Sequence, residues 1–145
     1  MSLFAGENPN LGTTTAISGD IVYPYRHIDA SLVSTLPATA ANLGNIFIAD
    51  RAYQFVSAQE SHTVAGSDGG AVSLDIEKLA GTAALDAGVV MNASTINLKG
   101  TANTVQTLAP SATFANTQLA KGDRIALKDT GVLTAVAGLS VSIIL

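Results

Sequence analysis

The chain has 145 residues, which is enough for one domain with a single hydrophobic core. Charged residues make up 12% of it and apolar residues 48%, and this balance excludes an intrinsically disordered chain, because disordered chains are rich in charge and poor in apolar residues. Seven Lys and Arg residues against eleven Asp and Glu give a net charge of −4. The basic residues form no run or stripe, which argues against nucleic-acid binding.

The two ends of the chain carry no targeting or membrane signal. The N-terminus lacks both a basic region and an apolar segment, so we expect no secretory signal. The most apolar end, Val141–Leu145, is far shorter than the roughly 20 residues that span a bilayer. We therefore expect a soluble protein that is made in the cytoplasm and binds no membrane. A soluble monomer usually carries more Lys and Glu than this chain does, so we expect much of its surface to lie against other subunits.

The segment from residue 1 to 44 has little regular patterning and holds three of the four prolines. Proline removes a backbone donor and biases the preceding residue toward extended conformations. The segment nevertheless carries too many apolar residues for a solvated tail. We interpret it as an extended N-terminal arm that becomes ordered by packing on a partner. Within it, Asp29–Leu36 could alternatively form one short helix capped by Asp29.

After Gly44 an alternating apolar pattern predicts β-strands. Asn45–Ala49 begins a strand, Asp50 and Arg51 form a bend, and Tyr53–Val64 is long enough for one extended strand. Gly66–Gly70 is predicted to be a turn, because its glycines can adopt positive φ.

The clearest strand pattern lies in the middle of the chain, where Val72, Leu74 and Ile76 alternate with Ser73, Asp75 and Glu77. This predicts a half-buried strand whose acidic side chains face solvent. Further alternation appears at Ile96 and Leu98, at Ile125 and Leu127, and from Leu139 to Leu145. Helical periodicity is weak, with Thr82–Gly88 the best candidate. Short strands separated by turns favour one all-β domain over residues 45–145, with a compact sandwich-like or barrel-like fold.

Residues for catalysis are few. His27 and His62 lie far apart in the sequence, and no serine sits in a G-x-S-x-G motif. The Gly66–Gly70 loop lacks the Lys of a phosphate-binding loop. Asp75 and Glu77 share a strand face, but such pairs are usually just solvated. We therefore predict a protein that is not an enzyme and has no cofactor and no metal site.

Several segments together resemble a family of tailed-bacteriophage capsid decoration (cement) proteins. The resemblance extends from Asn45 to Leu145 and does not include the arm. The segments that carry it are Ile46–Ala49, Glu60–Lys78, Asn97–Val105, Leu119–Leu127, Thr130–Leu139 and the final alternating strand.

The resemblance implies a β-rich homotrimer on the exterior of the virion head, where it would clamp neighbouring subunits of the major capsid protein. Within the arm, Phe4, Tyr23 and Tyr25 are the expected contacts with the capsid or a neighbouring subunit, because aromatic rings supply large contact areas at small entropic cost. The alternative functions are a head-fibre or tail-fibre module that binds a host glycan and a small hydrolase. The hydrolase is disfavoured by the missing catalytic residues.

Overall fold

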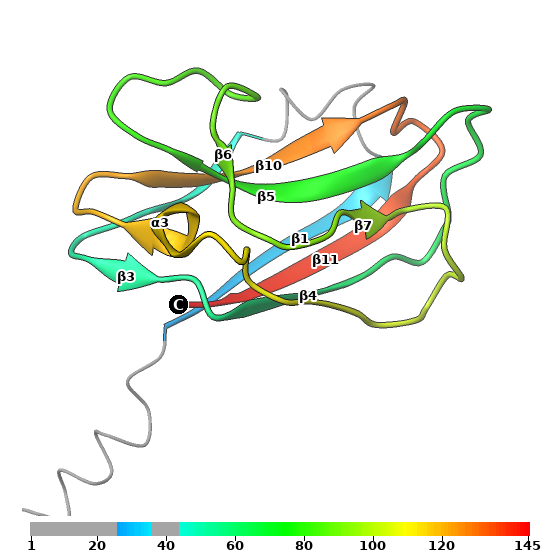
Figure 1. The fold of residues 1–145 in the computed structure, drawn as a ribbon. Coiled ribbons are helices and arrows are strands. Elements are labelled where there is room, and N and C mark those ends of the chain that lie inside the picture. The colour runs from blue at the N-terminus through cyan, green and yellow to red at the C-terminus, as the bar shows by residue number, and fades with distance from the viewer. Residues whose placement is uncertain (1–25, 36–43) are drawn as a thin grey trace, which may run out of the picture.

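The computed structural model describes residues 26–35 and 44–145, which form two antiparallel β-sheets stacked as a sandwich (Figure 1). Its elements are β1 His27–Thr35, β2 Asn45–Ile48, β3 Tyr53–Gln54, β4 Ser57–Ser61, β5 Ser73–Leu79, β6 Val89–Val90, β7 Ile96–Asn97, β8 Gln106–Leu108, α3 Phe114–Thr117, β9 Gln118–Leu119, β10 Arg124–Thr130 and β11 Ala137–Ile144. Sheet A has the strand order β1-β11-β4-β8, and sheet B has the order β2-β10-β5-β6, with β7 also pairing with β5. Strands β3 and β9 form a small third sheet. The predicted all-β fold is confirmed, and of the sandwich-like and barrel-like arrangements that the sequence left open, the structure shows a sandwich.

Strand β11 shows most directly how the sequence forms this core. Leu139, Val141 and Ile143 point into the space between the sheets and are buried, while Ser140 and Ser142 point outward. Side chains alternate between the two faces of a strand, so this pattern buries one face and leaves the other polar. Leu74 and Ile76 of β5 are buried in the same core, as predicted.

The part of the predicted N-terminal arm that the structure describes belongs to the β-sandwich. Residues 27–35 form β1, an edge strand of sheet A that pairs antiparallel with β11, with Ile28 opposite Ile143. Ile28 is buried in the core. The boundary at Gly44 is therefore wrong for these residues, and so is the alternative of a short helix at 29–36. Strand β1 itself contains no proline, so no backbone donor is missing from the strand that pairs with β11.

The predicted single strand from Tyr53 to Val64 is two strands in different sheets. Strand β3 pairs with β9, whereas β4 pairs with β11 and β8. Between them the Phe55 N–H donates to the Thr117 carbonyl at 2.8 Å and the Val56 N–H donates to the Ile144 carbonyl at 2.9 Å. Phe55 and Ala58 are both buried although they are three positions apart, so the alternation changes phase here and the chain crosses between sheets.

Two smaller expectations also differ from the structure. Thr82–Gly88 forms turns and bends rather than a helix, and α3, the helix found among the described residues, was not expected. Asp75 and Glu77 are buried rather than solvated, because the loop after β5 folds back over the outer face of sheet B.

A pair of isoleucines tests the placement of the core. Ile76→Ala should lower the free energy of unfolding by about 2–5 kcal/mol, because it leaves a cavity at a fully buried position. Ile48→Ala is the matched control on strand β2, where the side chain is 65% exposed, and it should change stability by no more than about 0.5 kcal/mol. Urea denaturation of both variants makes the comparison. Equal losses would show that the assigned core face is wrong.

Candidate functional site

The outer faces of the two sheets differ in what covers them. On sheet B, Arg124 donates through Nη2 to the carbonyls of Gly81 and Ala83 at 3.2 and 2.6 Å. Lys128 donates through Nζ to the Asp86 carbonyl at 3.0 Å. Both cations stand on the outer face of β10, so they hold the loop of residues 80–88 against sheet B. The protein therefore covers this face with its own chain and uses its charges to do so.

The outer face of sheet A carries mainly polar side chains, most of them Ser or Thr, and among the described residues no element packs over it. The strand registers place Ser31, Ser140 and Ser61 in one row and Asp29, Ser142, Gln59 and Thr107 in the next. All of these side chains are exposed or half-buried. We call this surface the polar face. Its members are His27, Asp29, Ser31, Ser57, Gln59, Ser61, Thr107, Ser140, Ser142 and Ile144.

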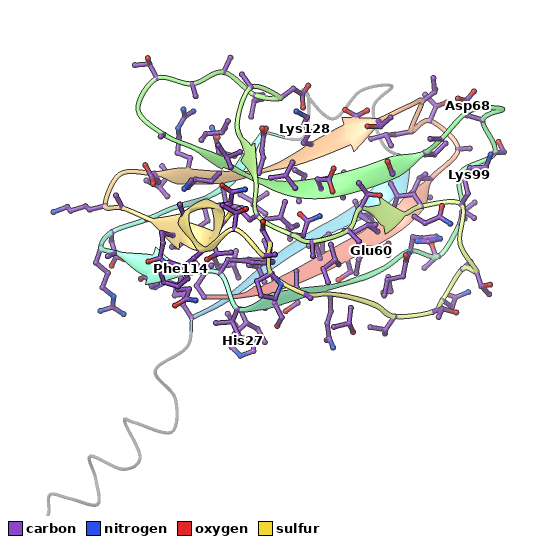
Figure 2. All side chains as sticks on the ribbon, viewed as in Figure 1. His27, Glu60, Asp68, Lys99, Phe114 and Lys128 are labelled. Atoms are coloured by element: carbon purple, nitrogen blue, oxygen red, sulfur yellow. The ribbon has the colours of Figure 1, made fainter. Side chains whose placement is uncertain are left out.

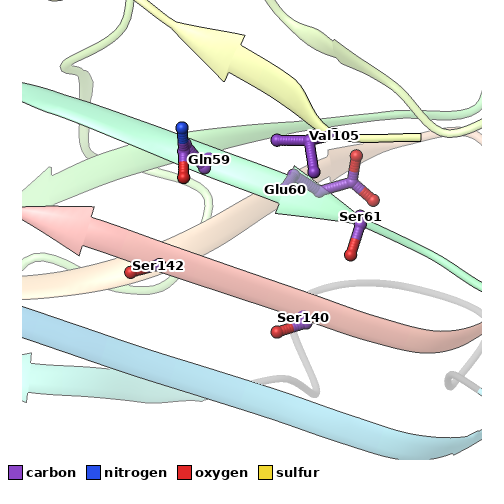
Figure 3. A pocket seen from close by; sticks show the side chains of 6 residues that line it. All are labelled: Gln59, Glu60, Ser61, Val105, Ser140 and Ser142. Atoms are coloured by element: carbon purple, nitrogen blue, oxygen red, sulfur yellow. The ribbon is translucent and has the colours of Figure 1, made fainter. Parts of the chain in front are cut away.

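A shallow hollow of about 140 Å³ lies on the polar face. Figure 3 shows Ser61, Ser140 and Ser142 on the neighbouring strands β4 and β11, and Gln59, Glu60 and Val105 complete the lining. Small-molecule sites usually enclose about 300–1,000 Å³ and have largely apolar walls. The hollow is thus better suited to receive a side chain from a partner surface than to hold a ligand.

Buried Glu60 of β4 and buried His62, which follows β4, form a polar cluster with half-buried Gln106 of β8. Glu60 Oε1 lies 2.8 Å from His62 Nδ1, and His62 Nε2 lies 3.3 Å from the carbonyl oxygen of Gly100. Glu60 and His62 are almost completely buried, and Figure 2 shows Glu60 between the two sheets. The second Glu60 oxygen, Oε2, accepts a hydrogen bond of 2.8 Å from Gln106 Nε2.

The hydrogen bonds of this cluster fix how many protons it holds. The Gln106 amide is oriented by Asn97, whose N–H donates to Gln106 Oε1 at 3.1 Å and whose carbonyl accepts from Nε2 at 2.8 Å. Glu60 Oε2 must then be an acceptor, and His62 Nε2 must donate to the Gly100 carbonyl. One proton therefore lies between Glu60 Oε1 and His62 Nδ1, whichever atom carries it. Burial raises the pKa of Glu60, and the hydrogen bonds from His62 and Gln106 partly oppose this shift.

Asp75 and Glu77 lie on β5 of sheet B, and each accepts hydrogen bonds from different partners. Asn92 donates to Asp75 Oδ1 at 2.7 Å, and its own side-chain oxygen accepts from the Ile76 N–H at 2.8 Å. Glu77 accepts two backbone N–H groups, from Asp86 and Gly88, both at 2.8 Å. These carboxylates therefore anchor the chain that follows β5 instead of facing solvent. The sequence alternation shows which side chains face away from the core, but it cannot show that a loop covers them.

The sequence-predicted chemical groups do not assemble into a reactive site. His62 is sealed in the interior with both ring nitrogens engaged, while His27 lies on the polar face. Within residues 26–35 and 44–145, no three His, Cys, Asp or Glu side chains are grouped to hold a metal ion. The Gly66–Gly70 segment is an irregular loop with a bend at Gly69 and Gly70, and Lys99 Nζ donates to the carbonyls of Asp68 and Gly70 at 2.7 and 3.1 Å (Figure 2).

The predicted contact residues Phe4, Tyr23 and Tyr25 lie outside the described residues. The polar face was not predicted as a site. A signal for it was present in the alternation of Ser140 and Ser142 with the apolar residues of the last strand, because these outward positions lack the Lys and Glu expected of a solvent face. No helix among the described residues is long and apolar enough to span a membrane.

The chain matches no protein-family model and no curated protein sequence. Its fold is similar to that of a chain in the solved structure titled "Capsid of Ralstonia phage GP4", with a TM-score of 0.55 and 15% sequence identity. The match covers 83% of this chain and 79% of that chain. At this identity the likeness shows a shared fold that extends over most of both chains.

The buried Glu60–His62 pair predicts a particular dependence of stability on pH. A pKa raised by folding contributes stability below the ordinary value near 4.5, and this contribution is lost as the pH rises through the raised pKa. In Glu60→Gln, the new amide can donate to His62 Nδ1 and accept from Gln106, so the network keeps its hydrogen bonds while the titrating carboxyl group of Glu60 is removed. We expect the variant to gain stability relative to the wild type as the pH rises above 4.5 and through the raised pKa of Glu60, measured by urea denaturation. Parallel pH curves for the two proteins would contradict this.

The same substitution at the other buried glutamate should have the opposite result. Glu77 accepts two backbone N–H groups through its two oxygens, and in Glu77→Gln one N–H would face an amide NH₂ group. We expect a loss of about 1–3 kcal/mol in the free energy of unfolding at neutral pH, because a buried donor is left unsatisfied. Glu60→Gln is the matched control. Equal stability changes in the two variants at pH 7 would show that the proton assignment is wrong.

Proposed function

We propose that this protein is a capsid decoration (cement) protein, which binds the outer surface of a phage head and stabilises the lattice of the major capsid protein. The observation that carries the proposal is the shared fold with a chain of a phage capsid structure over most of both chains. The described side chains fit a structural role, because the buried acidic groups and the histidine are engaged in holding strands and loops together.

The physical basis of such a role is mass action. A protein that binds the assembled lattice but not its separated subunits adds its binding free energy to the stability of the lattice. A homotrimer would bring three equivalent contacts to the head, so individually weak contacts would become strong in combination. In this proposal the protein is made in the host cytoplasm and resides on the exterior of the virion. Its partners are the major capsid protein and other copies of itself.

We also propose that the residues before β1 contribute to attachment, with Phe4, Tyr23 and Tyr25 as the main contacts. The chain joins sheet A at Arg26, where the Arg26 N–H donates to the Leu145 carbonyl at 2.8 Å and the Leu145 N–H donates back to the Arg26 carbonyl at 2.9 Å. Because of these two hydrogen bonds, Arg26 is the first described residue that a truncated chain must keep. A deletion that ends before Arg26 leaves the described sheet complete, whereas deletion of residues 1–30 would remove the first half of β1.

Deletion of residues 1–24 should leave a folded β-sandwich that binds heads about tenfold more weakly or worse, because aromatic anchors commonly carry more than 1 kcal/mol each. Circular dichroism reports the fold, and co-sedimentation with heads lacking this protein reports binding. The triple variant Phe4→Ala, Tyr23→Ala, Tyr25→Ala tests the rings with the backbone kept. If both variants sediment with heads as well as the full-length chain, the attachment role of these residues is wrong.

The stabilising role has its own test in the thermal rupture of heads. Adding the full-length protein should raise the temperature at which heads lose their integrity, because binding favours the assembled state. Unchanged rupture at saturating protein would contradict the cement function. Specific binding on a glycan array, with no binding to heads, would favour the fibre-module alternative.

A further inference from the structure

We propose that the polar face of sheet A is the surface through which copies of this chain pack against one another. The inference rests on the oligomer included in the proposed function, and it names the surface at which copies meet. The occupant is a second copy of the chain, and the reasons lie in the charge, the side-chain chemistry and the exposure of this face.

The first reason is charge. The chain carries a net charge of −4, so two copies repel each other at most orientations. Among the described residues of the polar face, only Asp29 and His27 can ionise, and the face contains no Lys, Arg or Glu. An ordinary solvent-facing sheet face is rich in such residues. The polar face is thus a surface on which copies of an acidic protein can approach with little repulsion.

The second reason is the chemistry of the side chains. Ser31, Ser61 and Ser140 lie side by side across three strands, and Ser142 follows in the next row. A hydroxyl group both donates and accepts hydrogen bonds, so a serine surface can bond to a copy of itself when symmetry brings equivalent residues together. Serine also loses little side-chain entropy when it is immobilised, in contrast to Lys or Gln.

The third reason is the contrast with sheet B. The outer face of sheet B is covered by the loop of residues 80–88, which Arg124, Lys128 and Glu77 hold in place. The polar face is the side of the sandwich on which no described element lies. Beside it Val105 is 61% exposed and lines the hollow with Ser61 and Ser140, which gives a contact between copies an apolar component next to the hydroxyl groups.

The test places charge at the centre of the face. The double variant Gln59→Glu, Ser140→Glu adds two negative charges per copy, and both positions are exposed, so the fold should be kept. Gln54→Glu, Ser94→Glu is the matched control, because it adds the same charges at exposed positions away from the polar face. Sedimentation velocity measures the mass of each protein as a function of concentration, and circular dichroism checks the fold.

We expect wild type and control to form the same oligomer and the double variant to dissociate at least tenfold more readily, because like charges at a contact are strongly unfavourable. A monomeric wild type at all concentrations would overturn the inference. So would a folded double variant with the wild-type mass. The symmetry of the oligomer follows from the measured mass.

A second measurement needs only a near-isosteric change. The chain contains no cysteine, so Ser140→Cys and Ser94→Cys each provide a single thiol for a maleimide reagent. At concentrations where the wild type is oligomeric, Cys at 140 should react several-fold more slowly than Cys at 94, and this difference should vanish on dilution. Equal rates at all concentrations would overturn the inference.

Measuring how the double variant binds heads distinguishes a failure of this inference from a failure of the proposed function. If the double variant keeps the wild-type mass but loses binding to heads, the polar face belongs to the capsid contact and the inference fails. If the wild type associates through this face but never binds heads, the inference holds and the decoration function fails.

Discussion

Sheet A depends on the pairing of its two longest strands, β1 and β11, which come from opposite ends of the described chain. Strand β11 lies between β1 and β4, so both neighbours take their principal hydrogen bonds from it. Its inward residues Leu139, Val141 and Ile143 also belong to the hydrophobic core. Because these contacts join distant parts of the sequence, sheet A can close only after most of the chain is available, which is typical of slow-folding β proteins.

Many charged side chains of this protein form hydrogen bonds with other parts of the same chain. Lys78 donates to backbone carbonyls of α3 and β9, and Lys99, Arg124 and Lys128 donate to backbone carbonyls of loops. Glu60, Asp75 and Glu77 are buried and hydrogen-bonded. A buried charge without a partner would be costly, so each of these contacts also specifies where its loop must lie. The burial of these three carboxylates leaves the described surface less charged than the composition suggests, and the polar face is one example of such a surface.

The sequence was sufficient to predict elements whose pattern is local. Alternation in β11 and the core positions of β5 follow from neighbouring residues, and both were predicted correctly. Three features depend on distant residues and were missed. Strand β1 needs its partner near the C-terminus, the break after Gln54 needs two different partner strands, and the burial of Glu77 needs the loop at Asp86 and Gly88. No window of adjacent residues contains that information.

The contrast between the two outer faces also constrains how such a protein can act. A face built from hydroxyl groups gains little from the hydrophobic effect, and each exchange of water for a protein partner contributes only about 0.5–1.5 kcal/mol. Association through such a face is therefore modest for any single contact and depends on repetition and on neighbouring apolar residues such as Val105. In the proposed function, a capsid lattice would supply that repetition by holding many copies at equivalent positions.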